Sequence, residues 1–197
     1  MNGIHEIYVD TGGTFTDCIC KCPGGEYKRL KVLSNSSLRG KITRVISGTE
    51  FEISTSWAFD DKLLTGFLFR IIPASYTKIK IKVYNSKSSR ITIDHSLPSL
   101  PGAGQSFEIT SGEEAPVLGA RLLTKTPLDG VFPPMDLKLG STKGTNALLE
   151  HKGGRTLFIT TKGFADLLEI GNQSRPDIFA LNVQKRSMLY SEVIEVD

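Results

Sequence analysis

The sequence lacks the apolar segments that characterise membrane and secreted proteins. No run of apolar residues approaches the roughly 18 to 20 that a helix needs to cross a bilayer. The first residues, MNGIHE, contain neither the basic stretch nor the apolar core of a secretory signal peptide. We therefore expect a soluble protein of the cytoplasm that has no membrane partner.

Cysteine and histidine are scarce, with three of each, and their spacing does not favour a zinc site. Zinc ligands usually come in pairs two to four residues apart, with a second pair elsewhere. Cys18, Cys20 and Cys22 instead occupy alternate positions of one segment, and the histidines are far apart in the sequence. Alternate residues of a strand share one face, so we expect the cysteines to be structural and to face a sheet.

Charge of one sign is also limited, since the net charge is only +3. The region 38–112 is mildly basic, but its residues Lys78, Lys80 and Lys82 alternate with apolar residues, which is typical of the solvated side of a half-buried strand. No aromatic stacking pattern accompanies these lysines. We therefore expect no nucleic-acid partner, and a nucleic-acid-binding module in this region stays as an alternative for a binding experiment.

The most informative stretch is IYVDTGGTFTD at residues 7–17. Ile7 and Val9 alternate with polar residues in a strand pattern, and a second alternating segment follows from Phe15. The glycines between them, Gly12 and Gly13, permit the positive φ of a tight turn. The stretch therefore predicts a β-hairpin with a glycine turn.

This hairpin has the composition of a phosphate-binding turn. Glycines let backbone N–H groups approach an anion closely, and hydroxyl donors surround them. The candidate phosphate-binding residues are Thr11, Gly12, Gly13, Thr14 and Thr16. Asp10 ends the first strand, and a carboxylate there suits magnesium, which is usually held by one or two carboxylates and the phosphates of the substrate. The alternative is an ordinary hairpin turn, since the same residues are common in turns.

Beyond the hairpin, the pattern predicts an α/β fold that is interrupted by an all-β unit. A third strand is expected over Tyr27 to Leu33, and only short strand-like runs follow across 38–111. A capping box at Ser111 predicts a helix that starts there and ends near 126–127. Strands at 136–141 and 155–161 then alternate with helices at 146–152 and 164–170, and Gly171 is expected to end the last helix. We therefore assign 1–37 and 112–197 to the host domain and 38–111 to the inserted unit.

Helices that link parallel strands place loops at the carboxyl ends of the strands, where α/β sheets bind ligands. Two such loops are expected at 141–146 and 161–163. The alternative for both is ordinary turn chemistry.

Several motifs together resemble the N-terminal part of the hydantoinase A and 5-oxoprolinase family. They are VDTGGTFTD at 9–17, GSTKGTNALLE at 140–150, TKGF at 161–164, DLLEIGNQSRPDIF at 166–179 and EVIEVD at 192–197. The resemblance covers about 1–37 and 136–197 and is greatest to the 5-oxoprolinases. Ser141 and Lys143 depart from the family pattern, which commonly has a second threonine and a small apolar residue there. The β-rich region is longer than is usual in the family, so nothing is carried over to it.

The resemblance implies an actin-like ATPase, that is, a ribonuclease-H-like half-domain, acting as an enzyme on cyclic amide C–N bonds. ATP and magnesium would be required: ATP would phosphorylate the amide oxygen of a small cyclic substrate, 5-oxo-L-proline, which water then opens to L-glutamate. Asp10 would be the catalytic and metal-binding residue. The residues implied on the substrate side are Thr142, Thr145, Asn146 and Arg175. For Asn146 the alternative is a helix cap.

The resemblance also implies that the chain is an N-terminal fragment, inactive alone, because an actin-like ATPase needs a second lobe for adenosine. The partner would be the remainder of the same enzyme or a second subunit of the hydantoinase B type, and homo-oligomer formation is left open. Alternative enzymes are an N-methylhydantoinase, an acetone carboxylase-type subunit and a sugar or acetate-type kinase. An actin-like nucleotide switch is the alternative from another class.

Overall fold

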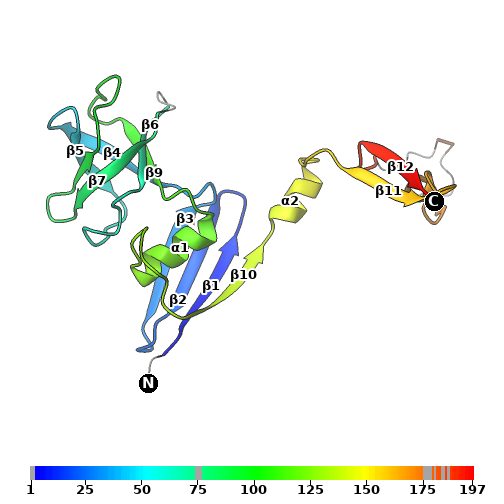
Figure 1. Cartoon of the computed structure of the whole chain (residues 1–197), viewed down its shortest axis with the longest axis horizontal. Helices are drawn as coiled ribbons and strands as arrows, with labels where there is room; N and C mark the ends of the chain where they lie inside the picture. The colour runs from blue at the N-terminus through cyan, green and yellow to red at the C-terminus, as the bar shows by residue number, and fades with distance from the viewer. Residues whose placement is uncertain (1–2, 74–76, 175–178, 180, 183–184, 186) are drawn as a thin grey trace. The chain divides into compact units, whose positions relative to one another are not determined.

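The structure is a computed structural model that describes residues 3–73, 77–174, 179, 181–182, 185 and 187–197. The chain divides into two compact units, Met1–Lys143 and Gly144–Asp197 (Figure 1). Each unit is described by itself. Taken together, they form a mixed α/β structure with several sheets.

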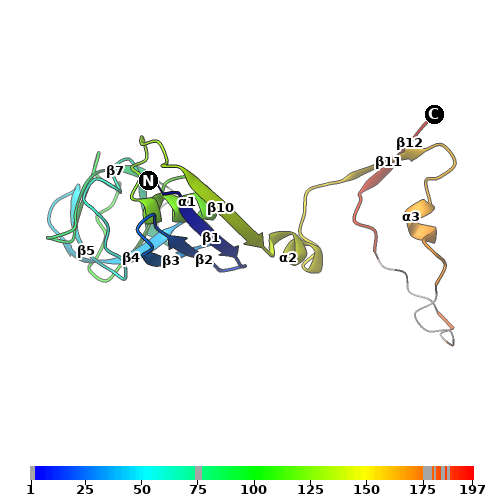
Figure 2. The same ribbon diagram turned by 90° about the horizontal axis from the view of Figure 1, so that it is seen from below.

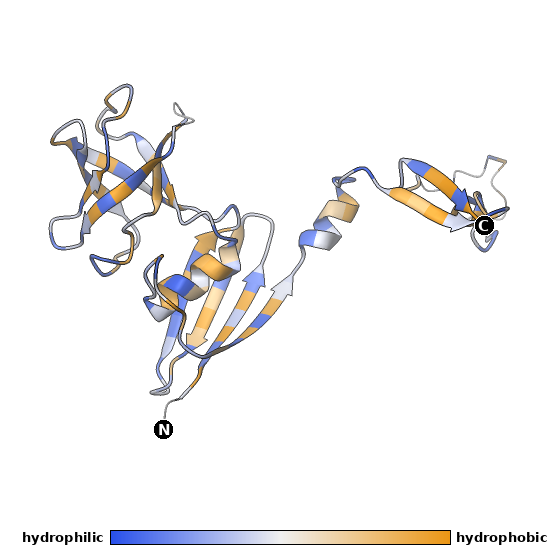
Figure 3. Cartoon of the chain, viewed as in Figure 1, coloured by the Kyte–Doolittle hydropathy of each residue, from blue (hydrophilic) through white to orange (hydrophobic). Residues whose placement is uncertain are grey.

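A four-stranded sheet carries the candidate hairpin. Strands β1 (His5–Thr11), β2 (Phe15–Lys21) and β3 (Tyr27–Leu33) form an antiparallel meander, as the alternating pattern predicts. β10 (Met135–Ser141) pairs with β1 in parallel, so the strand order is β10-β1-β2-β3. Apolar and polar residues alternate along these strands (Figure 3). Helix α1 (Ala115–Thr124) covers one face of the sheet and leaves the other exposed (Figures 1 and 2).

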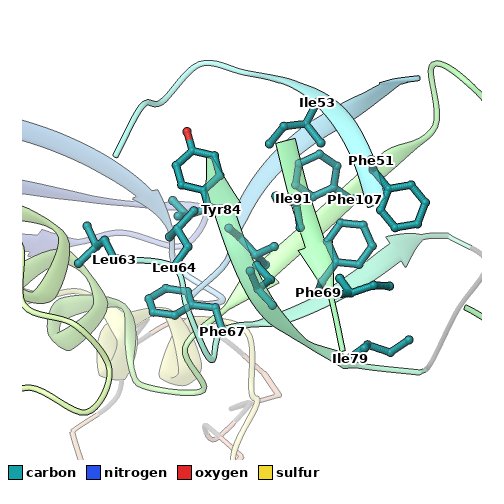
Figure 4. Packing of buried hydrophobic residues seen from close by; sticks show 14 of the residues in the cluster. Phe51, Ile53, Leu63, Leu64, Phe67, Phe69, Ile79, Tyr84, Ile91 and Phe107 are labelled. Carbon is teal, nitrogen blue, oxygen red and sulfur yellow. The ribbon is translucent and has the colours of Figure 1, made fainter. Parts of the chain in front are cut away.

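Six strands between Leu38 and Thr110 close into a barrel in the order β4-β5-β8-β7-β6-β9. Their bounds are Leu38–Val45 (β4), Glu50–Thr55 (β5), Leu68–Ile72 (β6), Ile79–Asn85 (β7), Arg90–Ile93 (β8) and Ser106–Thr110 (β9). Stacked rings of Phe51, Phe69 and Phe107 fill the interior (Figure 4). The alternation of buried isoleucines with exposed lysines along β7 matches the predicted solvated strand face.

Helix α1 lies between two hydrophobic cores. Its Leu118 and Leu122 pack into the core of the barrel, whereas Ala120 and Leu123 pack against the sheet. The helix approaches β2 so closely that a Cβ on Gly119 would overlap the sulfur of Cys18. Glycine therefore occupies the interior of this helix because a neighbouring strand leaves no room for a side chain.

The cysteines have the structural role that their spacing predicts. Cys18 and Cys20 are buried beneath α1, and Cys22 is half-buried. Burial, with a smaller contribution from the Asp17 carboxylate, raises the pKa of the Cys18 thiol to about 11. Burial, followed by the neighbouring Cys22, raises the pKa of Cys20 to about 11 as well. Both thiols are therefore protonated and unreactive at neutral pH.

The predicted capping box at Ser111 is wrong. Helix α1 begins at Ala115, and its N-cap Glu114 makes no side-chain capping bond. The Ser111 hydroxyl instead accepts the N–H of Glu113 at 3.3 Å. Glu114, the glutamate of the predicted box, is itself the N-cap, and the carboxylate of the neighbouring Glu113 accepts the Nε–H of the buried Arg121 at 2.8 Å. The helix ends at Thr124, where Lys125 adopts a left-handed φ of 56°.

The second unit is small and includes all but the first residue of helix α2 (Lys143–Leu149). β11 (Leu157–Thr161) and β12 (Glu192–Val196) pair in parallel, and α3 (Leu167–Ile170, labelled in Figure 2) follows β11. Gly171 ends α3 with a φ of 56°, as predicted. No described residue of this unit is buried. Over the described parts of both units, no helix is long and apolar enough to span a membrane.

Candidate phosphate-binding site

The hairpin between β1 and β2 is closed by a short turn. The register pairs Asp10 with Asp17 and Thr11 with Thr16, and the N–H of Gly12 donates to the carbonyl of Phe15 at 3.0 Å. The prediction of a positive φ is wrong for Gly12. The space at Gly12 is nonetheless tight, because a Cβ there would lie 3.2 Å from the Phe15 carbonyl oxygen, which favours glycine. The Gly12 N–H is hydrogen-bonded inside the hairpin, so it is not a free donor for a phosphate, and Gly12 instead lets the two strands approach closely at the turn.

Ser34, which the sequence reasoning missed, holds this turn in place. Its N–H donates to the carbonyl of Thr14 at 2.9 Å, and its hydroxyl donates to the carbonyl of Gly12 at 2.8 Å. The same hydroxyl lies 3.1 Å from the hydroxyl of the fully buried Thr16. The available signal was the position of Ser34 directly after β3, because a meander brings the end of its third strand next to the turn that precedes the second.

The hairpin separates its polar side chains onto two faces. Thr16 points to the face that α1 covers, and the Thr11 hydroxyl is buried without a hydrogen-bond partner among the described residues. Asp10 and Asp17 lie on the opposite, exposed face. The predicted phosphate-binding threonines therefore do not all face the same side as the predicted metal-binding carboxylate.

Asp10 lies in a row of paired residues across the exposed face, between Gly140 of β10 and Asp17 of β2. Like charges directly opposite each other on paired strands repel. Asp17 has a counter-ion in Lys31 at 3.2 Å, but Asp10 has no ion pair within the described residues. A Cβ on Gly140 would lie 3.9 Å from the Asp10 carboxylate, so the glycine keeps this side of the carboxylate open.

These charges suit a hydrated cation rather than a site enclosed by protein ligands. Within the described residues, no group of three or more His, Cys, Asp or Glu side chains lies close enough to hold a metal ion. Magnesium is commonly held by one or two carboxylates, with waters and substrate phosphates as the other ligands. The exposed Asp10, with Asp17 opposite, fits that pattern of ligation.

Thr142 lies at the carboxyl ends of the two parallel strands, next to the hairpin. Its N–H donates to the carbonyl of Thr11 at 3.2 Å, and its hydroxyl lies 3.4 Å from the same oxygen. The preceding Ser141 hydroxyl accepts the N–H of Lys143 at 3.2 Å. The Lys143 ammonium lies 3.8 Å from the Glu114 carboxylate, and both side chains are exposed. The structure therefore brings Thr142 and the hairpin together.

The other predicted substrate residues lie in the second unit or outside the described residues. Thr145 and Asn146 belong to the second unit, in which Asn146 lies inside α2. The alternative that Asn146 caps this helix is wrong, because α2 begins at Lys143 and the Asn146 carbonyl accepts the N–H of Glu150. Arg175 lies outside the described residues.

Comparisons with known proteins agree on one family. Residues 105–197 match the family model of the hydantoinase/oxoprolinase N-terminal region. The chain is 57% identical over 61 residues to "5-oxoprolinase" of Dictyostelium discoideum, covering 31% of this chain and 5% of that protein. It is 48% identical over 101 residues to "5-oxoprolinase 1" of Arabidopsis thaliana, covering 47% of this chain and 8% of that protein. It is 45% identical over 93 residues to "5-oxoprolinase" of Saccharomyces cerevisiae, covering 43% of this chain and 7% of that protein.

The matched segment thus spans less than a tenth of the length of these curated relatives. No solved structure matches the chain.

Proposed function

Because residues 105–197 match the family model of the hydantoinase/oxoprolinase N-terminal region, we propose that the chain is the N-terminal part of an ATP-dependent cyclic-amide hydrolase. The proposed substrate is 5-oxo-L-proline, in keeping with the relatives named 5-oxoprolinase. The remainder of the enzyme, as one polypeptide or as a second subunit of the hydantoinase B type, would complete the active site.

The strand order supports an actin-like ATPase half-domain as the host fold. Three antiparallel strands, β1 to β3, are followed through α1 by β10, which adds in parallel beside β1. This is the arrangement expected of a ribonuclease-H-like sheet, in which the turn between the first two strands contacts phosphates.

The observation that carries the proposal is the position of Asp10 and the β1–β2 turn. Asp10 is exposed, has a second carboxylate opposite and no ion pair within the described residues, and precedes the turn held by Ser34. Magnesium bound there would offset the negative charge of the ATP phosphates. In this role the turn residues Gly13 and Thr14 would orient the terminal phosphate toward the substrate.

The chemistry follows from the weakness of an amide as an electrophile. The amide oxygen would form a bond to the γ-phosphorus of ATP as the bond from that phosphorus to ADP breaks. A water molecule would then add to the carbon, and the C–N bond of the ring would break as the nitrogen takes a proton, which leaves an acyl phosphate. A second water molecule would hydrolyse this acyl phosphate to the free carboxylate and inorganic phosphate. Thr142, beside the hairpin, and Thr145, Asn146 and Arg175 would hold the cyclic amide.

Asp10→Asn in the full-length enzyme tests this proposal. We expect turnover of ATP and 5-oxo-L-proline to fall about a hundredfold or more, because a neutral amide binds magnesium poorly and electrostatic contributions of this kind are about that large. Asp136→Asn is the matched control, since Asp136 is an exposed carboxylate of β10 in the same sheet. It should leave turnover unchanged. Near wild-type turnover in Asp10→Asn would exclude the assigned role.

The substrate requirement separates the proposal from the kinase alternative. A cyclic-amide hydrolase consumes ATP only when the cyclic amide is present, whereas a sugar or acetate-type kinase consumes it with a hydroxyl or carboxylate substrate. Measuring ADP release from the full-length enzyme with each substrate class distinguishes the two.

A further inference from the structure

A polar pocket lies in the first unit, beside the hairpin, and its lining does not include Asp10. Its volume is about 400 Å³, within the range of small-molecule sites. The loop 34–37, strands β6 and β9, and the residues that precede α1 line it. The charged residues of its lining are Arg70, Lys78, Glu108, Glu113, Glu114 and Lys143.

The most buried of these charged residues, Glu108, is paired with two cations. Glu108 is only 3% exposed and lies between two arginines on the neighbouring strands. Its carboxylate accepts Arg39 Nη2–H at 2.6 Å and Arg70 Nε–H at 2.9 Å. Burial alone would raise the pKa of Glu108, but the hydrogen bonds from Arg70 and Arg39 outweigh it and lower the pKa. One ionised carboxylate therefore faces two guanidinium groups, Arg70 in the lining and Arg39 outside it, and these three groups together carry one positive charge in excess.

The other carboxylates of the lining are also paired. Glu113 is held by Arg121, and Glu114 lies 3.8 Å from Lys143. Lys78, in contrast, has no ion pair within the described part of the chain. The uncompensated charge of the pocket is therefore positive.

The beginning of α1 contributes partial positive charge next to Glu113 and Glu114, whose carboxylates are already paired. The helix has no side-chain capping bond and no acidic residue in its first turn. The first N–H groups of a helix lack intrahelical partners, and the helix dipole places partial positive charge there. The residues that lead into this helix end, Gly112 to Glu114, form part of the pocket wall.

We propose that this pocket, between the barrel and the hairpin, binds a small molecule through an anionic group, either a carboxylate or a phosphate. Arg70 and Lys78 supply the cations, and Asn35 and Ser36 of the loop 34–37 supply further donors. The hydroxyls of Ser34 and Ser37 already donate to Gly12 and Asn35. The pocket does not depend on the proposed reaction. Ser34 belongs both to its wall and to the hydrogen bonds that hold the phosphate turn. Binding in the pocket is therefore transmitted to Gly12 and Thr14 of the hairpin.

Two probes, inorganic phosphate and L-glutamate, test the proposal when each is titrated into the 15N-labelled chain at constant ionic strength. We expect saturable amide shifts at Ser34 to Ser37 and at Gly112 to Glu114, with smaller shifts at Gly12 and Thr14. The probe that binds more tightly identifies the anion class. Lys78→Gln should weaken binding about fivefold, the upper range for one exposed ion pair.

Lys82→Gln is the matched control, because Lys82 is exposed on β7 and carries the same charge but does not line the pocket. It should bind both probes as the wild type does. Three results would overturn the proposal: no saturable shift, equal weakening by both substitutions, or phosphate shifts that Lys78→Gln leaves unchanged. The last result would place the phosphate at the hairpin alone.

Discussion

Ser34→Ala should loosen the phosphate hairpin without changing the fold. The Ser34 hydroxyl donates to the Gly12 carbonyl at 2.8 Å and lies 3.1 Å from the Thr16 hydroxyl. Alanine removes both contacts, while the backbone bond from residue 34 to the Thr14 carbonyl stays available. The substitution therefore separates the contribution of the side chain from that of the meander.

The expected magnitude follows from these two contacts. A typical hydrogen bond contributes about 0.5 to 1.5 kcal/mol net, and a buried group left without a partner costs about 1 to 3 kcal/mol. The Thr16 hydroxyl is fully buried, so water does not replace the lost partner. We expect the free energy of unfolding of the first unit to fall by about 1 to 3 kcal/mol.

Urea unfolding followed by circular dichroism measures this loss, and amide hydrogen exchange locates it. Exchange at Gly12, whose N–H closes the turn, should speed up more than exchange in the barrel. Ser54→Ala is the control, because Ser54 is exposed on β5 and its hydroxyl makes no hydrogen bond within the described residues. It should change stability by less than about 0.5 kcal/mol. If Ser34→Ala matches Ser54→Ala in both measurements, the hydroxyl does not hold the turn.

Two further predictions concern packing and pH. Gly119→Ala should destabilise the first unit by about 1 to 3 kcal/mol in urea unfolding, because the added Cβ would overlap the Cys18 sulfur. Adding Cys18→Ala to this variant should recover most of the lost stability. Gly102→Ala is the control and should cost nothing, because the space around Gly102 is open. A double variant no more stable than Gly119→Ala would show that the sulfur is not the obstacle. Glu108 has a lowered pKa in the folded state, so its stabilising contribution is present above its unfolded pKa and is lost as the pH falls through the folded value. Unfolding measured from pH 7 down to acid should therefore show a decline that Glu108→Gln makes shallower, and an unchanged slope in that variant would contradict this account.

The local alternation of apolar and polar residues was sufficient to predict the first three strands and the buried cysteines. The alternation of residues 7–22 and 27–33 predicts the meander, and the alternate cysteines predict a buried face, because strand side chains alternate between faces regardless of context. Gly171 ends α3 as predicted, since a left-handed φ at a helix end favours glycine. The phosphate-binding and substrate-binding roles of individual residues remain predictions.

Contacts between residues distant in sequence could not be predicted in this way. The capping box at Ser111 failed because the helix begins only at Ala115, with Glu114 as its N-cap, after a segment in which Glu113 pairs with Arg121, a contact that the motif does not include. Ser34 was missed because its partners, Gly12 and Thr16, are separated from it by two strands. Gly12 was expected to permit a positive φ, whereas what favours glycine there is the close approach of the Phe15 carbonyl. In each case the deciding partner is set by tertiary structure.

The barrel region differs from its flanks in sequence pattern, but it does not pack independently of them. The pattern of short strands alone separates 38–111 from its flanks. However, Leu118 and Leu122 of α1 lie after that region and pack into the hydrophobic cluster that fills the barrel. The opposite side of the same helix, at Ala120 and Leu123, packs on the sheet that carries the phosphate hairpin. Burying apolar surface on both sides makes α1 a shared support, because exposing either side would cost the hydrophobic stabilisation of that contact. A perturbation of the barrel is therefore expected to reach the sheet through α1 even where no residue of the hairpin is changed.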